Sequence, residues 1–391
     1  MSTSRQDPAG PYRNPVRSQA LRVINVACIL SVAACGGGSG SGGSMLQPST
    51  TGLTDSALVS DGVIAAAHTD SNLQNAWGMA FAPGGPLWIA DNNSNKATVY
   101  DGTGTPQSLV VSIPAGTNGP ANPTGQVYNG TADFVITTAA GSAPAQFIFA
   151  GEGGTVTGWA QTVSGATATV AYDDAAGGAV YKGLALLNDG TANHLYATDL
   201  HNAKIDAFDT SFRKVSVAGG FADPMIPSGF APFGIQVLNN QLYVTYAKQD
   251  ATAHDETLGA GLGYVNVFDA NGNLMKRFAS AGVLNAPWGI ALAPAGFGSV
   301  GGDLLVGNFG DGIINSFDPA SGNRLGSISL AGGKQLAIPG LWALVFGNGA
   351  ANQPADTLFY TAGPNNQTNG VFGSIKVVTG SSPPPCTGYG C

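Results

Sequence analysis

The sequence predicts an all-β protein, a six-bladed β-propeller with four-stranded blades. A strand-rich unit recurs six times along the 391 residues, and the repeats keep a nearly regular spacing. The units also lack helical hydrophobic periodicity, which argues against a helical solenoid. Repeats of this length with strand-like contents are typical of propellers, in which each unit forms one blade.

The clearest copy of the unit runs from Asn285 to Asp318. Its start, Ala286-Pro287-Trp288-Gly289, leads into a small-residue strand at 290–293. A Pro/Gly-rich loop and an apolar run at 304–306 follow, and a Gly-Asp-Gly turn leads to a third strand that ends on Phe317-Asp318. Short apolar runs between Gly, Pro, Asn and Asp turns predict strands joined by hairpins. One such meander cannot bury its faces alone, so each copy needs neighbours.

The other copies repeat this order of small-residue strand, apolar strand and polar turn. They lie at Asn75–Asp101, Pro123–Trp159, Val180–Asp209, Ala231–Asp269 and Pro339–Val377. Small residues mark the first strand of every unit, at Gly78, Gly125, Gly183, Gly234, Gly289 and Ala343, with separations of 47, 58, 51, 55 and 54 residues. Because the first strands of six blades converge on a central channel, small residues there let the backbones approach. Six copies in phase favour this arrangement over a β-sandwich with ordinary strand glycines.

The spacing leaves room for a fourth strand in each blade. The strand-like stretch Ala57–Ile64 has no unit of its own. We expect it to form the outer edge of the sixth blade, because this closes the ring and removes exposed sheet edges.

Residues 1–34 have the features of a lipoprotein-type signal peptide. Four arginines precede the apolar stretch Val23–Ala34, which is too short to span a bilayer as a helix. The end of this stretch with the next residue, Val32-Ala33-Ala34-Cys35, resembles a bacterial lipobox. In a lipobox the cysteine becomes the lipidated first residue of the mature chain. A secretory signal with a chance cysteine is the alternative.

The predicted organisation follows from these features. The signal peptide covers 1–34, a Gly/Ser-rich tether 35–55, the propeller 56–378 and a Pro-rich tail 379–391. A lipid on Cys35 predicts an extracytoplasmic, periplasmic-facing protein that is anchored to a bacterial outer membrane, or is secreted. The membrane is then a partner through the lipid anchor.

Charge further limits the classes of partner that the chain can bind, and the cysteine content limits its possible disulfides. Charged residues make up 10% of the chain, and its formal net charge is −8. Removal of residues 1–34 takes away four arginines and one aspartate, so the acidic excess grows. An acidic surface repels nucleic acid and anionic lipid, and we expect no nucleic-acid partner. Beyond Cys28 and Cys35, the chain has Cys386 and Cys391, which form either a small disulfide loop or two free thiols.

One mouth of the channel is the predicted site. In a four-stranded blade, the start of the first strand and the turn after the second strand lie on the same face. The ligand-binding residues expected there are Trp77, Asp91, Asn92, Asp199, His201, Trp288, Asn308 and Trp342. Aromatic faces beside oxygen acceptors suit a neutral or cationic, hydroxyl-bearing ligand, because carboxylates repel an anion. In the structural alternative, the Asp and Asn residues cap turns and the tryptophans pack between blades.

Two chemical interpretations of this mouth stay open. A divalent cation such as Ca²⁺, the one cofactor that the residues suggest, would need convergent oxygen ligands. The candidate ligands are Asp91, Glu152, Asp199 and Asn308. His201 with Asp199 or Lys182 offers acid–base or electrophilic catalysis. A lone histidine among turns is more often structural, so no catalytic residue is assigned.

Two other motifs are interpreted as loops. His254-Asp255-Glu256 lies in an insertion of the fourth unit and could bind a metal, but no paired ligands stand at zinc spacing, which favours a solvated polar loop. The G-x-G-x-x-G pattern at 296–301 lies between two strands, without the following helix that places a pyrophosphate.

The repeat phrases carry a family resemblance over 58–377. The units resemble NHL-type and six-bladed lactonase/lyase-type propellers. NAWGMAFAP, VYKGLALL, APFGIQ, APWGIALAPAGFG, LLVGNFGDG and GLWALVFGNG more closely resemble a family of uncharacterised secreted bacterial propellers. Some members of that family carry a PEP-CTERM sorting signal, from which the tail SSPPPCTGYGC differs. The resemblance implies the fold and no established activity. Gluconolactonase-like enzymes hold a metal with Glu, Asn and Asp, but these positions have no residue-by-residue match here.

The predicted function is therefore a ligand- or protein-binding scaffold that uses one mouth of the channel. Its partner would be an unknown small molecule, glycan or protein. The alternative is a metal-assisted hydrolase or lactonase-like enzyme with its site at the same mouth.

Overall fold

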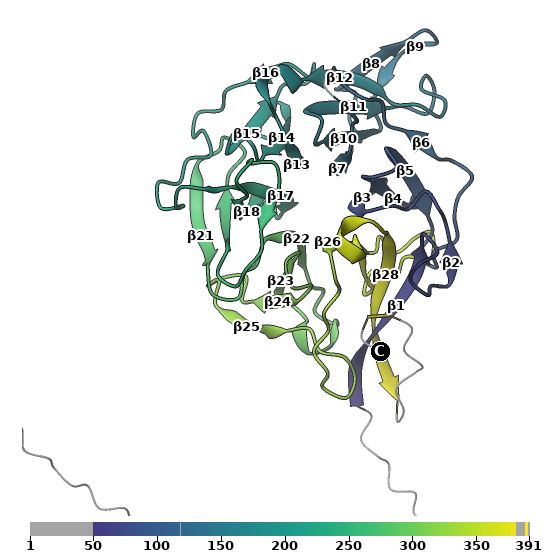
Figure 1. Ribbon diagram of the computed structural model, residues 1–391, viewed down its shortest axis with the longest axis vertical. Coiled ribbons are helices and arrows are strands. Elements are labelled where there is room, and N and C mark those ends of the chain that lie inside the picture. Colours follow the sequence, from purple (N-terminus) through teal and green to yellow (C-terminus); the bar gives the residue numbers. More distant parts are fainter. Residues whose placement is uncertain (1–49, 118, 381–387, 390–391) are drawn as a thin grey trace, which may run out of the picture. The chain divides into compact units, whose positions relative to one another are not determined.

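A computed structural model describes residues 50–117, 119–380 and 388–389 and confirms the six-bladed propeller. Six antiparallel sheets of four principal strands form a ring (Figure 1). Within the described ranges, no helix has the length and apolar character needed to cross a bilayer. The predicted signal peptide, the lipidation candidate Cys35 and the pair Cys386 and Cys391 all lie outside the described residues.

The blades follow one another along the chain, and their strands run in order from the channel outward. Blade 1 has β3 (Ala76–Phe81), β4 (Leu87–Asp91), β5 (Lys96–Tyr100) and β6 (Val111–Ser112); blade 2 has β7 (Pro123–Tyr128), β10 (Phe147–Gly151), β11 (Thr155–Trp159) and β12 (Thr169–Asp173); blade 3 has β13 (Tyr181–Asn188), β14 (Asn193–Asp199), β15 (Lys204–Phe208) and β16 (Lys214–Val215). Blade 4 has β17 (Phe230–Leu238), β18 (Gln241–Gln249), β20 (Gly263–Phe268) and β21 (Leu274–Ser280); blade 5 has β22 (Pro287–Leu292), β23 (Leu304–Asn308), β24 (Ile314–Phe317) and β25 (Arg324–Ser327); blade 6 has β26 (Leu341–Phe346), β27 (Leu358–Ala362), β28 (Val371–Gly380) and β1 (Thr50–Ser60).

Strand β1 closes the ring, as the sequence predicted. It pairs antiparallel with β28, from Thr50 opposite Gly380 to Ser60 opposite Val371. The strand begins earlier and ends earlier than the predicted Ala57–Ile64, and the short β2 (His68–Thr69) adds to its outer side. Leu53 and Val59 of β1 are buried in the cores on either side of this blade. The two ends of the propeller sequence therefore share one sheet.

Glycines permit the close approach of the innermost strands around the channel. A Cβ atom added to Gly125 would lie 2.3 Å from the amide nitrogen of Leu184 in the next blade, and one added to Gly234 would lie 2.3 Å from the carbonyl oxygen of Trp288. Real Cβ atoms do not tolerate such distances. Small residues at the start of each unit were predicted to relieve crowding at the axis. The close approach of the backbones at these glycines confirms that reason.

Several short elements interrupt the repeat. The hairpin β8 (Val135–Thr138) and β9 (Gly141–Pro144) lies between β7 and β10, and β19 (Glu256–Thr257) pairs with the end of β18. The turn α1 (Pro364–Gln367) joins β27 to β28, with Asn365 and Asn366 at φ 54°. Asn is the residue type that adopts this left-handed conformation most readily after Gly. Both β19 and α1 belong to the face on which the candidate site lies.

Candidate functional site

An aromatic plug closes the predicted mouth of the channel. Trp77 and Trp342 stack with ring centroids 3.6 Å apart, and Phe309 stacks on Trp342 at 4.1 Å. Trp288 meets both tryptophans edge-on, at 6.2 and 6.0 Å. Trp77 and Trp342 are 1% and 0% exposed. The indoles fill this end of the channel instead of lining an open one, which is the packing alternative considered for them.

A charged residue, Lys182, is packed against this plug. Its side chain is fully buried, and its Nζ lies 5.2 Å from the centre of the Trp77 ring. The ammonium donates to a carboxylate oxygen of Glu152 and, at 3.2 Å, to Oδ1 of Asp255. Burial lowers the pKa of Lys182, but the charges of Glu152, Glu256 and Asp255 outweigh burial and hold the pKa above its ordinary value. These ion pairs therefore favour the protonated, charged form of Lys182.

The carboxylates around Lys182 come from two blades. Glu152 lies in the turn between β10 and β11, and His254 and Asp255 lie in the insertion before β19. Glu152, His254 and Asp255 each place one metal-ligating atom within 4.8 Å of the others, and among the described residues no other group of three His, Cys, Asp or Glu does so. His254 Nδ1 lies 3.2 Å from Asp255 Oδ1, and this contact raises the pKa of the imidazole. Burial raises the pKa of Glu256 to about 7.

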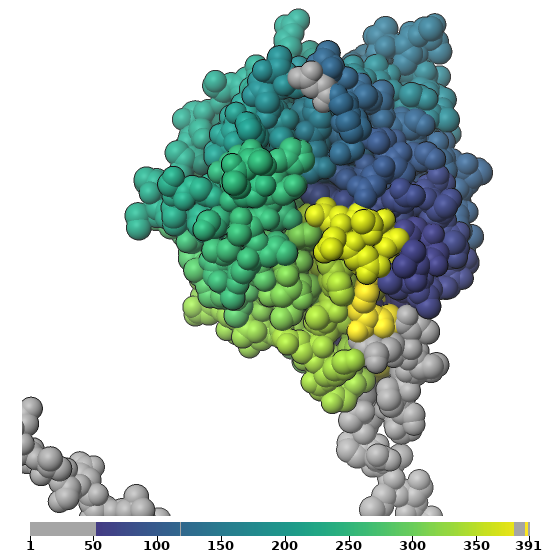
Figure 2. Space-filling view, in the orientation of Figure 1, coloured from purple at the N-terminus to yellow at the C-terminus, as the bar shows by residue number. Residues whose placement is uncertain are grey.

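Side-chain amides connect this charged cluster to the plug. Trp342 Nε1 donates to Asn75 Oδ1 at 3.2 Å, Asn75 Nδ2 donates to Asn92 Oδ1 at 3.2 Å, and Asn92 Nδ2 donates to Glu152 Oε2 at 2.9 Å. Asn75 also donates to Gln367 of α1 at 3.1 Å. In Figure 2 the yellow segment that carries α1 lies close to the middle of the visible face. The polar chain holds Glu152 in place and covers the plug.

An open cleft of about 530 Å³ adjoins the cluster. Glu152, His201, Thr252 and His254 supply its polar side chains, and residues 178–180 supply part of its backbone wall. His201 and Thr252 are exposed. The cleft therefore combines a carboxylate, a hydroxyl and two imidazoles, which together both donate and accept hydrogen bonds.

Most of the ligand-binding residues predicted from the sequence are buried. Those with almost no accessible surface are Trp77, Asp91, Asn92, Asp199, Asn308 and Trp342, whereas His201 is exposed and Trp288 is partly exposed. Asp199 Oδ1 accepts from the amide of Val180 at 3.1 Å, and Asn308 Oδ1 accepts from the amide of Asn285 at 3.1 Å. These two side chains secure the starts of the inner strands, as the turn-capping alternative describes. Only His201 of the predicted set lines the cleft.

The predicted cation ligands are not gathered in one group. Of Asp91, Glu152, Asp199 and Asn308, only Glu152 belongs to the cluster of ligating atoms. Burial raises the pKa of Asp91 well above its ordinary value. His254 and Asp255 join Glu152 instead. The sequence interpretation of a solvated loop missed this contact because Glu152 is supplied by another blade, and the length of the insertion was the one available signal.

Lys182 also bears on whether a metal ion binds here. Its Nζ already bonds Glu152 and Asp255, two of the three clustered ligands. A divalent cation at these ligands must therefore compete with a tethered ammonium. The residue types fit a metal, but Lys182 already neutralises part of the negative charge of Glu152 and Asp255.

Comparisons with known proteins place the chain among uncharacterised relatives. No known family profile matches it. The uncharacterized protein R648 of Acanthamoeba polyphaga mimivirus is 34% identical over 325 residues, which cover 81% of this chain and 78% of R648. The uncharacterized protein L690 of the same virus is 33% identical over 330 residues, which cover 81% of this chain and 84% of L690. The bacterial and secreted character implied by the family resemblance stays a prediction.

Solved structures share the fold at low identity. The soluble aldose sugar dehydrogenase from Escherichia coli in the apo-form matches with a TM-score of 0.50 and 11% identity, over 83% of this chain and 99% of that one. The gluconolactonase XC5397 from Xanthomonas campestris matches with a TM-score of 0.47 and 15% identity, over 78% and 88%. At such identity the likeness concerns the fold alone.

Proposed function

We propose that this chain, which belongs to the family of the uncharacterized mimivirus proteins R648 and L690, is a binding propeller that takes a neutral, hydroxyl-bearing molecule in the cleft beside Lys182. The observation that carries the proposal is a buried ammonium bound to two carboxylates directly beside an open cleft. Ionisable groups with shifted pKa values in a cleft favour a functional site.

The polar groups of the cleft suit hydroxyl groups. An imidazole both donates and accepts, the hydroxyl of Thr252 does the same, and the carboxylate of Glu152 accepts. A hydroxyl group also plays both roles, so it can pair with any of them. The volume of about 530 Å³ lies within the usual range of small-molecule sites.

The charge balance favours a neutral ligand. Lys182 offsets one of the two carboxylates that it contacts, Glu152 and Asp255. His254, whose pKa is raised by its contact with Asp255, partly offsets the other. An anionic ligand would still meet the carboxylate of Glu152 in the lining. The ion pairs that favour the charged form of Lys182 also support binding over catalysis by a lysine base, because a proton acceptor requires a neutral amine.

A sugar titration tests the proposal. We expect calorimetry to show binding of D-glucose, weaker binding of D-glucosamine and none of D-glucuronate. His201→Ala and His254→Ala should each weaken D-glucose binding by about tenfold, the effect of one lost hydrogen-bonding group. His68→Ala, on the outer strand β2, is the matched control and should bind as the parent does. Preferential binding of D-glucuronate, or unchanged binding by both cleft variants, would overturn the proposal.

The clustered ligands favour one second candidate, a metal-assisted hydrolase. Glu152, His254 and Asp255 would hold the ion, and three protein ligands with an open position are typical of catalytic zinc sites. Such an ion would supply a bound water of lowered pKa. A rise in melting temperature with zinc, manganese or calcium that Glu152→Gln abolishes would favour this function. No rise would leave the binding function.

We also propose that a lipid on Cys35 anchors the chain to a bacterial membrane. The lipobox-like sequence and the Gly/Ser-rich stretch after it support this proposal. Cys35→Ala should then release the protein from the membrane fraction or leave it unprocessed. Membrane retention and processing equal to those of the parent would contradict lipidation.

A further inference from the structure

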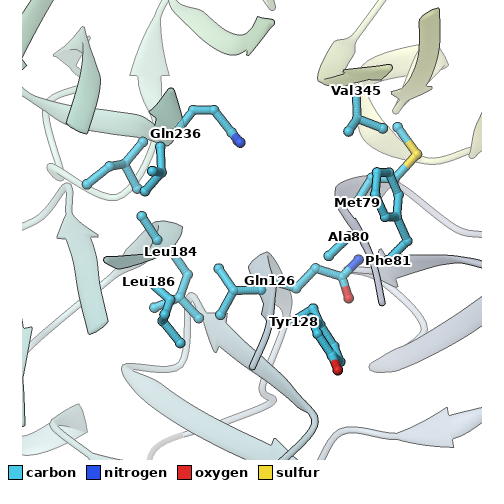
Figure 3. A pocket seen from close by; sticks show the side chains of 13 residues that line it. Met79, Ala80, Phe81, Gln126, Tyr128, Leu184, Leu186, Gln236 and Val345 are labelled. Carbon is cyan, nitrogen blue, oxygen red and sulfur yellow. The ribbon is translucent and has the colours of Figure 1, made fainter. Parts of the chain in front are cut away.

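The channel has a second opening, at the end opposite Lys182. The inner strands run from the plug to this end, so that β3 starts beside Trp77 and finishes at Phe81. A pocket of about 240 Å³ lies there, lined by five of the six inner strands. Figure 3 shows its side chains around an open centre. We call this pocket the funnel.

The funnel ends blindly. A smaller cavity of about 40 Å³ continues inward from it, lined by Gly78, Gly125 and Trp288 among others. Trp288 is also the edge-on member of the aromatic plug. The same residue therefore lines the inner cavity and belongs to the plug, which lies between the two openings.

The lining of the funnel carries no charged side chain and is mostly apolar. Met79, Phe81, Tyr128, Leu186 and Val345 are all partly exposed there, and no charged side chain belongs to the lining. Partly exposed apolar groups gathered in a concave surface are typical of a ligand site and not of ordinary surface. Methionine and aromatic side chains adapt well to flat or branched apolar ligands.

One polar side chain reaches into the open centre. Gln236 is exposed, and Figure 3 shows its carboxamide extending away from β17 into the funnel. A carboxamide both donates and accepts a hydrogen bond. It can therefore pair with a hydroxyl or an amide, whereas no charged side chain of the lining can offset the full charge of an ion.

We propose that the funnel binds a neutral small molecule that has an apolar ring or branched body and one hydroxyl or amide group. The apolar body lies against Met79, Phe81 and Leu186, and the polar group meets Gln236. The blind end limits the size. An apolar cavity of about 150 Å³ holds benzene, so the funnel takes a ring with one or two substituents and excludes a long chain that would thread the channel.

The test uses 4-ethylphenol as the neutral probe and 4-ethylbenzoate as its anionic counterpart, with binding followed by saturation-transfer NMR on the full chain. We expect 4-ethylphenol to bind and 4-ethylbenzoate to bind at least about tenfold more weakly, because the carboxylate would lose hydration where no positive side chain offsets its charge. Gln236→Trp should fill the funnel and weaken 4-ethylphenol binding at least about tenfold. Gln236 is exposed, so this variant should keep the parent's circular dichroism spectrum.

Two controls separate this site from the rest of the surface. Gln161→Trp adds the same ring at an exposed glutamine after β11 and should leave binding unchanged. His254→Ala alters the cleft at the other end and should also leave binding unchanged. The proposal is wrong if 4-ethylphenol does not bind the parent, if 4-ethylbenzoate binds equally well, or if folded Gln236→Trp binds the probe as tightly as Gln161→Trp does.

Discussion

Lys182 determines the chemistry of the mouth beside it because its charge is buried and is paired with carboxylates. Its ammonium bonds Glu152 and Asp255 and lies against the Trp77 ring. Because these partners replace the water that would hydrate the ammonium, the fold can hold a lysine with no exposed surface here. The same contacts leave the accessible polar groups of the cleft to His201, Thr252 and His254.

Removal of this charge should destabilise the fold. Lys182→Met leaves the nearly buried carboxylate of Glu152 without its cation, and we expect the free energy of unfolding to fall by about 3–5 kcal/mol. Lys248→Met, at an exposed lysine on β18, should change it by less than about 0.5 kcal/mol. The double variant Lys182→Met/Glu152→Gln should recover part of the loss. Urea denaturation measures all of these, and equal stability of Lys182→Met and the parent would refute the coupling.

Glu256 should make stability depend on pH. Burial raises its pKa from an ordinary value of 4.5 to about 7, opposed by the charge of Lys182. Between these values the folded protein keeps a proton that the unfolded chain has released, so the contribution is complete below pH 4.5 and is lost as pH rises to 7.

The variant Glu256→Gln isolates this contribution, because it cannot titrate. We expect the unfolding free energy of the parent, relative to Glu256→Gln, to fall by about 1–3 kcal/mol from pH 4.5 to pH 7.5. Denaturation at several pH values checks the trend. A constant difference, or one that grows with pH, would show that Glu256 titrates normally in the folded protein.

The sequence predicted which residues stand at the mouth better than it predicted where their side chains point. Asp199 and Asn308 do end second strands, as predicted, but their oxygens accept from the amides of Val180 and Asn285. Whether such a side chain faces the channel or its own turn depends on a rotation that local sequence does not encode. The contact of Asp255 with Lys182 was beyond local patterns as well, because 73 positions separate the two residues.

At the scale of elements, the inner strands were predictable because crowding at the axis restricts their composition. The glycines of the repeat stand where the neighbouring backbone comes closest, as Gly125 does against Leu184. The hairpin β8–β9 and the strand β19 were not predicted, since they occur once and repeat analysis detects only what recurs. The insertion that carries β19 is one of these elements, and it brings His254 and Asp255 to the site.

A matched pair of glycines tests the crowding argument. Gly125→Ala places a methyl group against backbone atoms of blade 3 that cannot move aside, and we expect a loss of about 1–3 kcal/mol in the free energy of unfolding. A methyl group added at Gly296 would meet no atom within 4 Å, so Gly296→Ala should change stability by less than about 0.5 kcal/mol. Chemical denaturation compares them. Equal effects of the two substitutions would show that close approach does not explain the repeated glycine.

At the scale of the whole molecule, one ring presents two openings that differ in their ionisable groups. The aromatic plug of Trp77, Trp288, Phe309 and Trp342 separates a cleft lined by a carboxylate and two imidazoles from a funnel without a charged side chain. The fold class and ring closure followed from the repeats, because the period and the strand pattern restrict the chain to few architectures. The separation of the two ends did not, since it depends on how four aromatic side chains from three blades pack together.

The four histidines offer the most direct test of the cleft as the binding site. Histidine labelled with ¹³C gives one ring signal each for His68, His194, His201 and His254, which single substitutions to alanine assign. On addition of D-glucose, we expect the signals of His201 and His254 to shift together along one saturable curve while those of His68 and His194 stay in place. Shifts confined to His68 or His194, or no shift at any histidine at the highest D-glucose concentration, would contradict a hydroxyl-binding cleft beside Lys182.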